Sequence, residues 1–129
     1  VRIVGPVREK TQVELSYTDA IFLKLKPTLR DSGDLAGTPG ALLIAPKRKI
    51  KIKQGVINVR RHIHCNPKEA KALGLKNGML VSVKVKGTRS LTFHNVKVRV
   101  KRNYRLCMHI DTDEGNACGI TKKGKGYLI

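Results

Sequence analysis

The sequence predicts a mainly β protein, and three observations point to that class. The core must be built from Val, Ile and Leu, which favour strands, because the 129 residues include two Phe, three Tyr and no Trp. Apolar and charged residues alternate over 49–53 and 96–101 with the period of a half-buried strand. A strand, a short helix and further strands also recur along the chain, as in small closed barrels with helices at their ends.

The helices are expected where a capping residue precedes an acidic residue in the first turn and a stripe of small and apolar residues. Ser16 and Asp19 begin the first such stretch, and Asn66 and Glu69 begin the second. A third stretch begins at Asp111. This template predicts short helices over residues 16–26, 66–76 and 111–120.

The strands are expected around these helices, where apolar residues form short runs or alternate with charged ones. One strand precedes each helix, and further strands follow the first and second helices. In chain order the expected strands cover residues 10–15, 41–45, 49–53, 55–64, 79–85, 90–100 and 104–110. We therefore divide the chain into a partial β-barrel over 1–58 and a second β-barrel with capping helices over 59–129.

The net charge of +18 predicts polyanionic partners, namely nucleic acid, anionic lipid or phosphorylated small molecules. Solvated strand faces account for much of the alternating charge, and the few aromatic residues supply little surface for stacking bases. No apolar run approaches the roughly 18 residues of a membrane span, so we expect no membrane association. Three cysteines without framework spacing indicate reduced thiols and a cytoplasmic location.

His62-Ile63-His64 is the most informative stretch of the chain. Side chains two residues apart in a strand point to the same face, and imidazole is a frequent zinc ligand. The alternative interpretation is a pair of hydrogen-bonded surface histidines. The repeat places His64 in register with Glu14 and His109, so that three candidate ligands lie at equivalent strand ends.

These residues leave several arrangements open. His62, His64 and His109 together would leave an open coordination position, as catalytic zinc sites do. Adding Cys107 would close the site into a structural one. Glu14 is a candidate fourth ligand, a partner that orients an imidazole or a general base; without a metal it pairs with a lysine. His94 is expected to be an exposed turn residue.

Four motifs resemble the PduL-type phosphate propanoyltransferases, the phosphotransacylases of bacterial microcompartments. They cover residues 5–14, 30–40, 61–64 and 108–117 and occur in the family's order. The resemblance implies two helix-capped β-barrels, of which this chain lacks the N-terminal strands. It also implies transfer of a propanoyl or acetyl group between coenzyme A and phosphate at a two-zinc site, a reaction of propanediol degradation.

The resemblance further implies roles for individual residues. It makes Glu14 a ligand of one zinc ion, and Arg8 the catalytic residue that contacts phosphate. The ligands of the other zinc ion match His62, His64 and His109. The remaining positions that line the substrate site match Arg2, Ser32 and Asn116.

The family also carries an earlier His-x-His that binds the same zinc ion as Glu14, whereas no histidine precedes His62 here. We therefore expect one of the two zinc sites to be intact and the isolated chain to be weakly active or inactive. Three explanations stay open: the chain is a C-terminal fragment, the missing segment lies on another chain, or the protein is a degenerate homologue with another role. The expected partners are acyl-CoA and phosphate, or coenzyme A and acyl phosphate. A homo-oligomer in the cytoplasm or a microcompartment lumen is expected. The alternative is a degenerate, basic β-barrel that binds nucleic acid or a large assembly.

Overall fold

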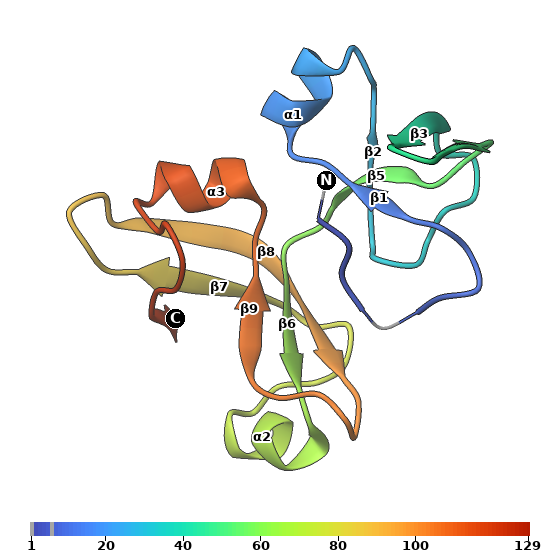
Figure 1. Cartoon of the computed structure of the whole chain (residues 1–129). Helices are drawn as coiled ribbons and strands as arrows, with labels where there is room; N and C mark the ends of the chain where they lie inside the picture. The colour runs from blue at the N-terminus through green and yellow to red at the C-terminus, as the bar shows by residue number, and fades with distance from the viewer. Residues whose placement is uncertain (1, 6) are drawn as a thin grey trace. The chain divides into compact units, whose positions relative to one another are not determined.

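The computed structural model describes residues 2–5 and 7–129, and it confirms a mainly β fold with short capping helices (Figure 1). The chain divides into two compact units, residues 1–59 and 60–129. Among the described helices, none has the length and apolar character that crossing a membrane requires.

The sheet of the first unit is organised around its most buried strand. Its three strands lie in the order β1 (Val13–Glu14), β5 (Val56–Val59) and β2 (Thr28–Arg30), and both pairings are parallel. Val56 and Ile57 in the central strand are completely buried. Because β1 pairs with β5, Glu14 lies on the strand next to the buried central strand of this sheet.

A separate two-stranded hairpin also belongs to the first unit. It consists of β3 (Ala41–Ala45) and β4 (Arg48–Ile52), paired antiparallel. Its register sets Leu42 opposite Lys51 and Ile44 opposite Lys49, so apolar and cationic side chains share one face. The predicted alternation is present, but Ile44 is 70% exposed, so this face of the hairpin is not a core face.

The second unit contains a five-stranded mixed sheet. Its strands lie in the order β10 (Gly126–Leu128), β7 (Leu80–Val85), β8 (Leu91–Val100), β6 (His62–Cys65) and β9 (Cys107–His109). β6 runs parallel to β8 and antiparallel to β9. The main core cluster is formed by Ile63, Val83, Val85, Phe93, Val96 and Cys118.

The three predicted helices are present and begin at the predicted capping residues. They are α1 (Tyr17–Phe22), α2 (Pro67–Ala72) and α3 (Thr112–Ala117). The side chains of Ser16, Asn66 and Asp111 each accept a hydrogen bond from the backbone N–H three residues further on. Each of the three candidate ligands in register therefore lies two residues before a helix cap.

The helices end earlier than predicted because each closes in a Schellman motif. Lys24, Gly74 and Gly119 adopt the left-handed conformation, with φ of 54°, 65° and 73°. The next N–H in each case donates back to the carbonyl five residues earlier, for example from Leu75 to Ala70 at 2.8 Å. Leu25, Leu75 and Ile120, which the pattern places at the ends of the helices, lie beyond them and pack in or against the core clusters.

The observed strands differ from the predicted ones in several places. β2 and β10 lie outside the predicted strands, and β1 and β9 are shorter than the strands expected over 10–15 and 104–110. The expected strand over 55–64 is broken at Arg60 and Arg61, where the chain leaves the sheet of the first unit and joins that of the second. His94 is exposed as predicted, but it lies within β8 rather than in a turn. The register of β7 with β8 shifts beside it, and Asn95 has a φ of 56°, so a strand irregularity occupies the place of the turn.

Candidate metal centre

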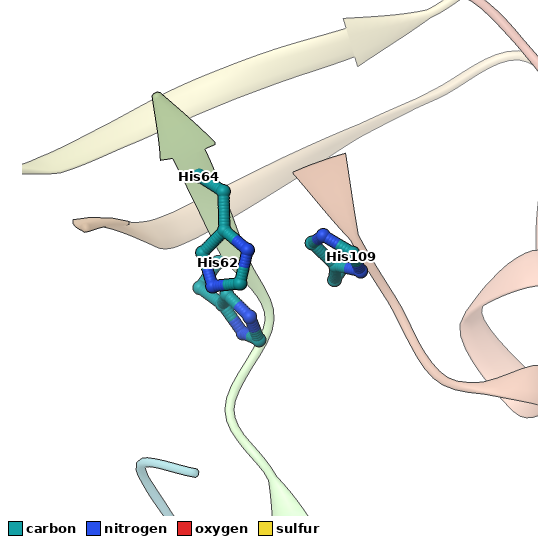
Figure 2. A group of neighbouring side chains, drawn as sticks. All are labelled: His62, His64 and His109. Atoms are coloured by element: carbon teal, nitrogen blue, oxygen red, sulfur yellow. The ribbon is translucent and has the colours of Figure 1, made fainter. Parts of the chain in front are cut away.

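Three of the four histidines converge on one face of the second unit's sheet (Figure 2). His62 and His64 lie two residues apart on β6, and His109 lies directly opposite His62 on β9. One ring nitrogen from each lies within 4.8 Å of the other two. The adjacent strands therefore present three imidazoles together without a contribution from any loop.

The strand period explains why these side chains share a face. Ile63 and Cys65 alternate with the two histidines of β6 and are buried on the core side of the sheet. On the neighbouring strand β8, Val96 and Val98 are also buried. The face opposite the core carries two cross-strand rows, which are His109, His62 and Lys97, and Cys107, His64 and Arg99.

His62 is fixed by a hydrogen bond with the backbone. Its Nδ1 lies 2.8 Å from the carbonyl oxygen of Arg60, and the residue is only 7% exposed. A carbonyl can only accept, so Nδ1 carries the hydrogen and donates. This tautomer leaves the lone pair on Nε2, the arrangement in which a ligating histidine is usually oriented by its other nitrogen.

His64 is kept neutral by its surroundings. Its pKa is lowered to about 4, first of all by burial and then by electrostatic interactions with His62, His109, Arg99 and Lys101. Its Nε2 is buried and has no hydrogen-bond partner among the described residues. An unprotonated, unpartnered imidazole nitrogen beside two others has the chemistry of a zinc ligand, so the donor set fits that ion.

Two neighbours complete the surroundings of the three histidines. Tyr104 stacks on His64, with ring centroids 3.8 Å apart and an interplanar angle of 19°. Cys107 lies opposite His64 but is exposed, and its Sγ is 3.6 Å from the carbonyl oxygen of Met108. In the described part of the chain the compact ligand group contains the three histidines and not Cys107.

A second polar cluster lies in the first unit and contains three of the predicted site residues. Oε1 of Glu14 accepts hydrogen bonds from Ser32 Oγ, at 3.2 Å, and from Gln12 Nε2. Arg8 Nη2 donates to the same Ser32 hydroxyl at 3.2 Å. Gln12 Oε1 in turn accepts the Gly33 N–H at 2.7 Å. The structure thus brings Arg8, Glu14 and Ser32 together.

The comparisons with known proteins decide the family. A family model described as phosphate propanoyltransferase matches residues 1–121. The chain belongs to this family. Proteins named phosphate propanoyltransferase from Listeria monocytogenes and Sebaldella termitidis are 45% and 49% identical to it, over 100% and 99% of this chain. One from Thermotoga maritima is 45% identical over 100% of the chain.

The chain spans only part of the length of these phosphate propanoyltransferases. It covers 61% of the relatives from Listeria monocytogenes and Sebaldella termitidis and 62% of the one from Thermotoga maritima. The two residue clusters described above lie entirely within the part of the family that this chain represents.

The other candidate residues are not part of either cluster as the structure describes them. Arg2 is exposed and lies in no helix or strand. Asn116 is exposed on α3, which begins shortly after His109. His94 contacts Ser82 Oγ through its Nδ1 at 2.7 Å and is not part of the ligand group.

Sequence reasoning missed two contributors to these clusters, and it also missed an ion pair next to His62. Gln12 is two residues from Glu14, and the strand period alone would have indicated its place. Tyr104 begins the strand expected over 104–110 but lies outside β9, so the strand period does not predict its stacking on His64. Arg61 forms an ion pair with Glu114, a residue distant in sequence, which only the tertiary structure reveals.

Proposed function

We propose that this chain carries part of the active site of an acyltransferase that moves a short acyl group between coenzyme A and phosphate. The observation that carries the proposal is the group of three imidazoles in a member of the phosphate propanoyltransferase family. The substrates are accordingly acyl-CoA and phosphate in one direction, and coenzyme A and acyl phosphate in the other.

His62, His64 and His109 would hold a zinc ion, each through one ring nitrogen. Bound there, zinc would lower the pKa of the coenzyme A thiol and so favour its nucleophilic thiolate. The chain's own contribution is to supply ligands that need no deprotonation: the pKa of His64 is about 4, and the Arg60 carbonyl fixes the tautomer of His62. Three protein ligands leave a position open to substrate.

The polar cluster of the first unit would bind the phosphate. Arg8 presents a guanidinium, whose planar fork suits phosphoryl oxygens. Its hydrogen bond to Ser32 and the Ser32 hydrogen bond to Glu14 hold these side chains together. In the acyl transfer this cation would offset the negative charge that develops on the carbonyl and phosphate oxygens.

Glu14 is proposed as a ligand of a second zinc ion. Within the described residues, both hydrogen bonds to its carboxylate go to Oε1, so Oε2 is available to a cation. One carboxylate oxygen is too few for a zinc site, which takes about four ligands. We therefore propose that the further ligands come from outside this chain and that the chain by itself retains one zinc ion.

The test combines metal analysis with an activity assay. The purified chain should contain about one equivalent of zinc, and the variant His62→Ala/His64→Ala should contain none. His94→Ala is the matched control, because it removes a histidine outside the ligand group, and it should keep its zinc. A wild-type chain that takes up no zinc at saturating concentrations would contradict the proposed centre.

The activity assay measures acetyl- or propanoyl-phosphate formed from the corresponding acyl-CoA and phosphate at saturating zinc. We expect the isolated chain to be weakly active, and an Arg8→Lys substitution in a full-length relative to raise KM for phosphate. Turnover by the isolated chain at the rate of a full-length relative would show that this chain is not a partial active site. We further propose a homo-oligomer in the cytoplasm or a microcompartment lumen.

A further inference from the structure

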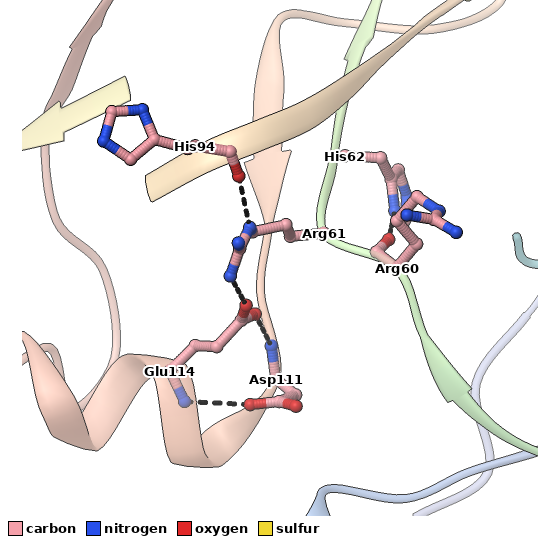
Figure 3. Close-up of polar contacts among 6 residues, drawn as sticks. All are labelled: Arg60, Arg61, His62, His94, Asp111 and Glu114. Atoms are coloured by element: carbon pink, nitrogen blue, oxygen red, sulfur yellow. Dashed lines mark hydrogen bonds and ion pairs between the residues drawn. The ribbon is translucent and has the colours of Figure 1, made fainter. Parts of the chain in front are cut away.

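We propose that Arg61 and Glu114 are positioning residues that hold His62 and His109 in register for metal binding. The ion pair between them joins the two segments that carry these histidines (Figure 3). This inference rests on the proposed zinc centre, but it concerns two residues that are not among the proposed zinc ligands.

Arg61 stands immediately before His62, where the chain enters β6, and its side chain is held at three points. Its Nη1 donates to Glu114 Oε1 at 2.6 Å, and its Nε donates to the carbonyl oxygen of His94 at 2.8 Å. The guanidinium also lies 5.6 Å from the centre of the Phe93 ring. The entry to β6 is therefore fixed both to β8 and to α3.

Glu114 uses its second oxygen to fix the segment that follows His109. Its Oε2 accepts the backbone N–H of Asp111 at 3.1 Å, while Asp111 Oδ1 accepts the Glu114 N–H at 2.8 Å. A single carboxylate thus bridges the residue before His62 and the residue two positions after His109. The side chains of Arg61 and Glu114 are only 31% and 20% exposed, so solvent screens this ion pair less than it would a surface pair.

The capping box at the start of α3 does not by itself explain why Glu114 forms an ion pair with Arg61. Asn66 and Glu69 form the same reciprocal pair of hydrogen bonds at the start of α2. Among the described residues, however, Glu69 has no arginine or lysine partner. A helix of this kind in this chain therefore starts without an ion pair, and the contact of Arg61 with Glu114 serves something other than helix initiation.

The need for such an anchor follows from the shortness of β9. This strand has three residues and lies at the edge of the sheet, where β6 is its one partner among the described strands. His109 at its end is exposed, so burial does not restrain it. A zinc ion requires its ligand nitrogens in a nearly tetrahedral arrangement. Residues that orient such ligands typically change metal affinity by about 10–100-fold when they are replaced.

The test measures zinc affinity of the whole chain by competition with a chromophoric chelator. Arg61→Met removes all the polar contacts of this side chain and should weaken zinc binding by about 10–100-fold. Arg61→Lys keeps the charge but not the fork that contacts two acceptors at once, so its affinity should be intermediate. Glu69→Gln is the matched control, because it weakens an equivalent capping box without an arginine, and it should bind zinc as the wild type does.

A second measurement needs no metal. In the metal-free chain, nuclear Overhauser contacts between the rings of His62 and His109 should be present in the wild type and in Glu69→Gln, and lost in Arg61→Met. Circular dichroism identifies any variant that does not fold. If Arg61→Met does not fold, the ring contacts of Arg61→Lys are compared with those of the wild type instead.

The outcomes separate the two proposals. Zinc affinity within twofold of the wild type, together with unchanged ring contacts in Arg61→Met, would overturn the positioning role. If the wild-type chain binds no zinc, the proposed metal centre is contradicted. If the contacts between the two rings are nevertheless lost in Arg61→Met, the positioning role of Arg61 is supported.

Discussion

Tyr104 lies flat against His64, with ring centroids 3.8 Å apart. The contact covers one face of the imidazole whose Nε2 is buried without a partner. It also withdraws the ring from water, and burial is the largest cause of the low pKa of His64.

Replacing Tyr104 should therefore change the protonation of His64. In Tyr104→Ala the ring becomes more hydrated, and its pKa should rise from about 4 toward the ordinary value of 6.5. Tyr104→Phe retains the stacked ring and should leave the pKa near 4. Titration of the His64 ring by NMR in the metal-free chain measures both variants. An unchanged pKa of His64 in Tyr104→Ala would show that groups other than Tyr104 shield the imidazole from water.

The depressed pKa of His64 also predicts how stability depends on pH. Between about pH 6.5 and pH 4 the unfolded chain binds a proton at His64 that the folded chain does not. The free energy of unfolding should therefore fall as pH is lowered through this window, and this contribution is present in full above pH 6.5. Denaturant unfolding in the presence of a chelator measures it.

The matched variant for this prediction is His64→Gln, which keeps a polar side chain but does not titrate. Its unfolding free energy should fall less steeply than that of the wild type between pH 6.5 and pH 4. Identical slopes in the two proteins would mean that His64 is not responsible, whatever the absolute stabilities are.

Local sequence rules predicted the parts of this fold that depend on neighbouring residues. The three helix caps and the common face of His62 and His64 follow from hydrogen bonding and strand period alone. The repeat also pointed correctly to His109, because it occupies the same place before a cap as His64 does. These features need no knowledge of which strands pair.

The parts that were missed depend on tertiary contacts. The break at Arg60 and Arg61 lies in an otherwise continuous β pattern, and it becomes evident only when β5 and β6 are found in different sheets. Glu114 reads as an ordinary capping-box residue, and only the return of α3 toward β6 gives it an arginine partner. Lys24 carries no turn signal, so the end of α1 could not be placed.

The Schellman ends make a prediction about Gly74. At its φ of 65° an L side chain is unfavourable by roughly 1–2 kcal/mol. Gly74→Ala should therefore lower the free energy of unfolding by about 1 kcal/mol or more, although nothing lies within 4 Å of the added Cβ. Denaturant unfolding of the metal-free chain measures the change.

Lys24 supplies the comparison for this prediction, because it occupies the equivalent position after α1 with a side chain in place. Lys24→Gly should leave stability unchanged or raise it slightly. A loss of stability in Lys24→Gly equal to that in Gly74→Ala would exclude left-handed strain as the cause.

The hairpin of β3 and β4 allows a test of the rival function, binding of nucleic acid by a basic β-barrel. Its exposed cations are Lys47, Arg48, Lys49, Lys51 and Lys53. Lys49 and Lys51 project on the same face, opposite Ile44 and Leu42. If this face contacts phosphates, Lys49→Gln/Lys51→Gln should weaken binding to single-stranded RNA and reduce the dependence of log K on log salt by about 0.7 for each lost contact.

The matched control for the hairpin is Lys71→Gln/Lys76→Gln, which removes two exposed cations from the second unit. A loss confined to the hairpin variant indicates a binding face. Equal, small losses in both variants would mean that affinity follows the net charge of +18. In that case the hairpin is a solvated strand pair, and the acyltransferase proposal needs no nucleic-acid partner beside it.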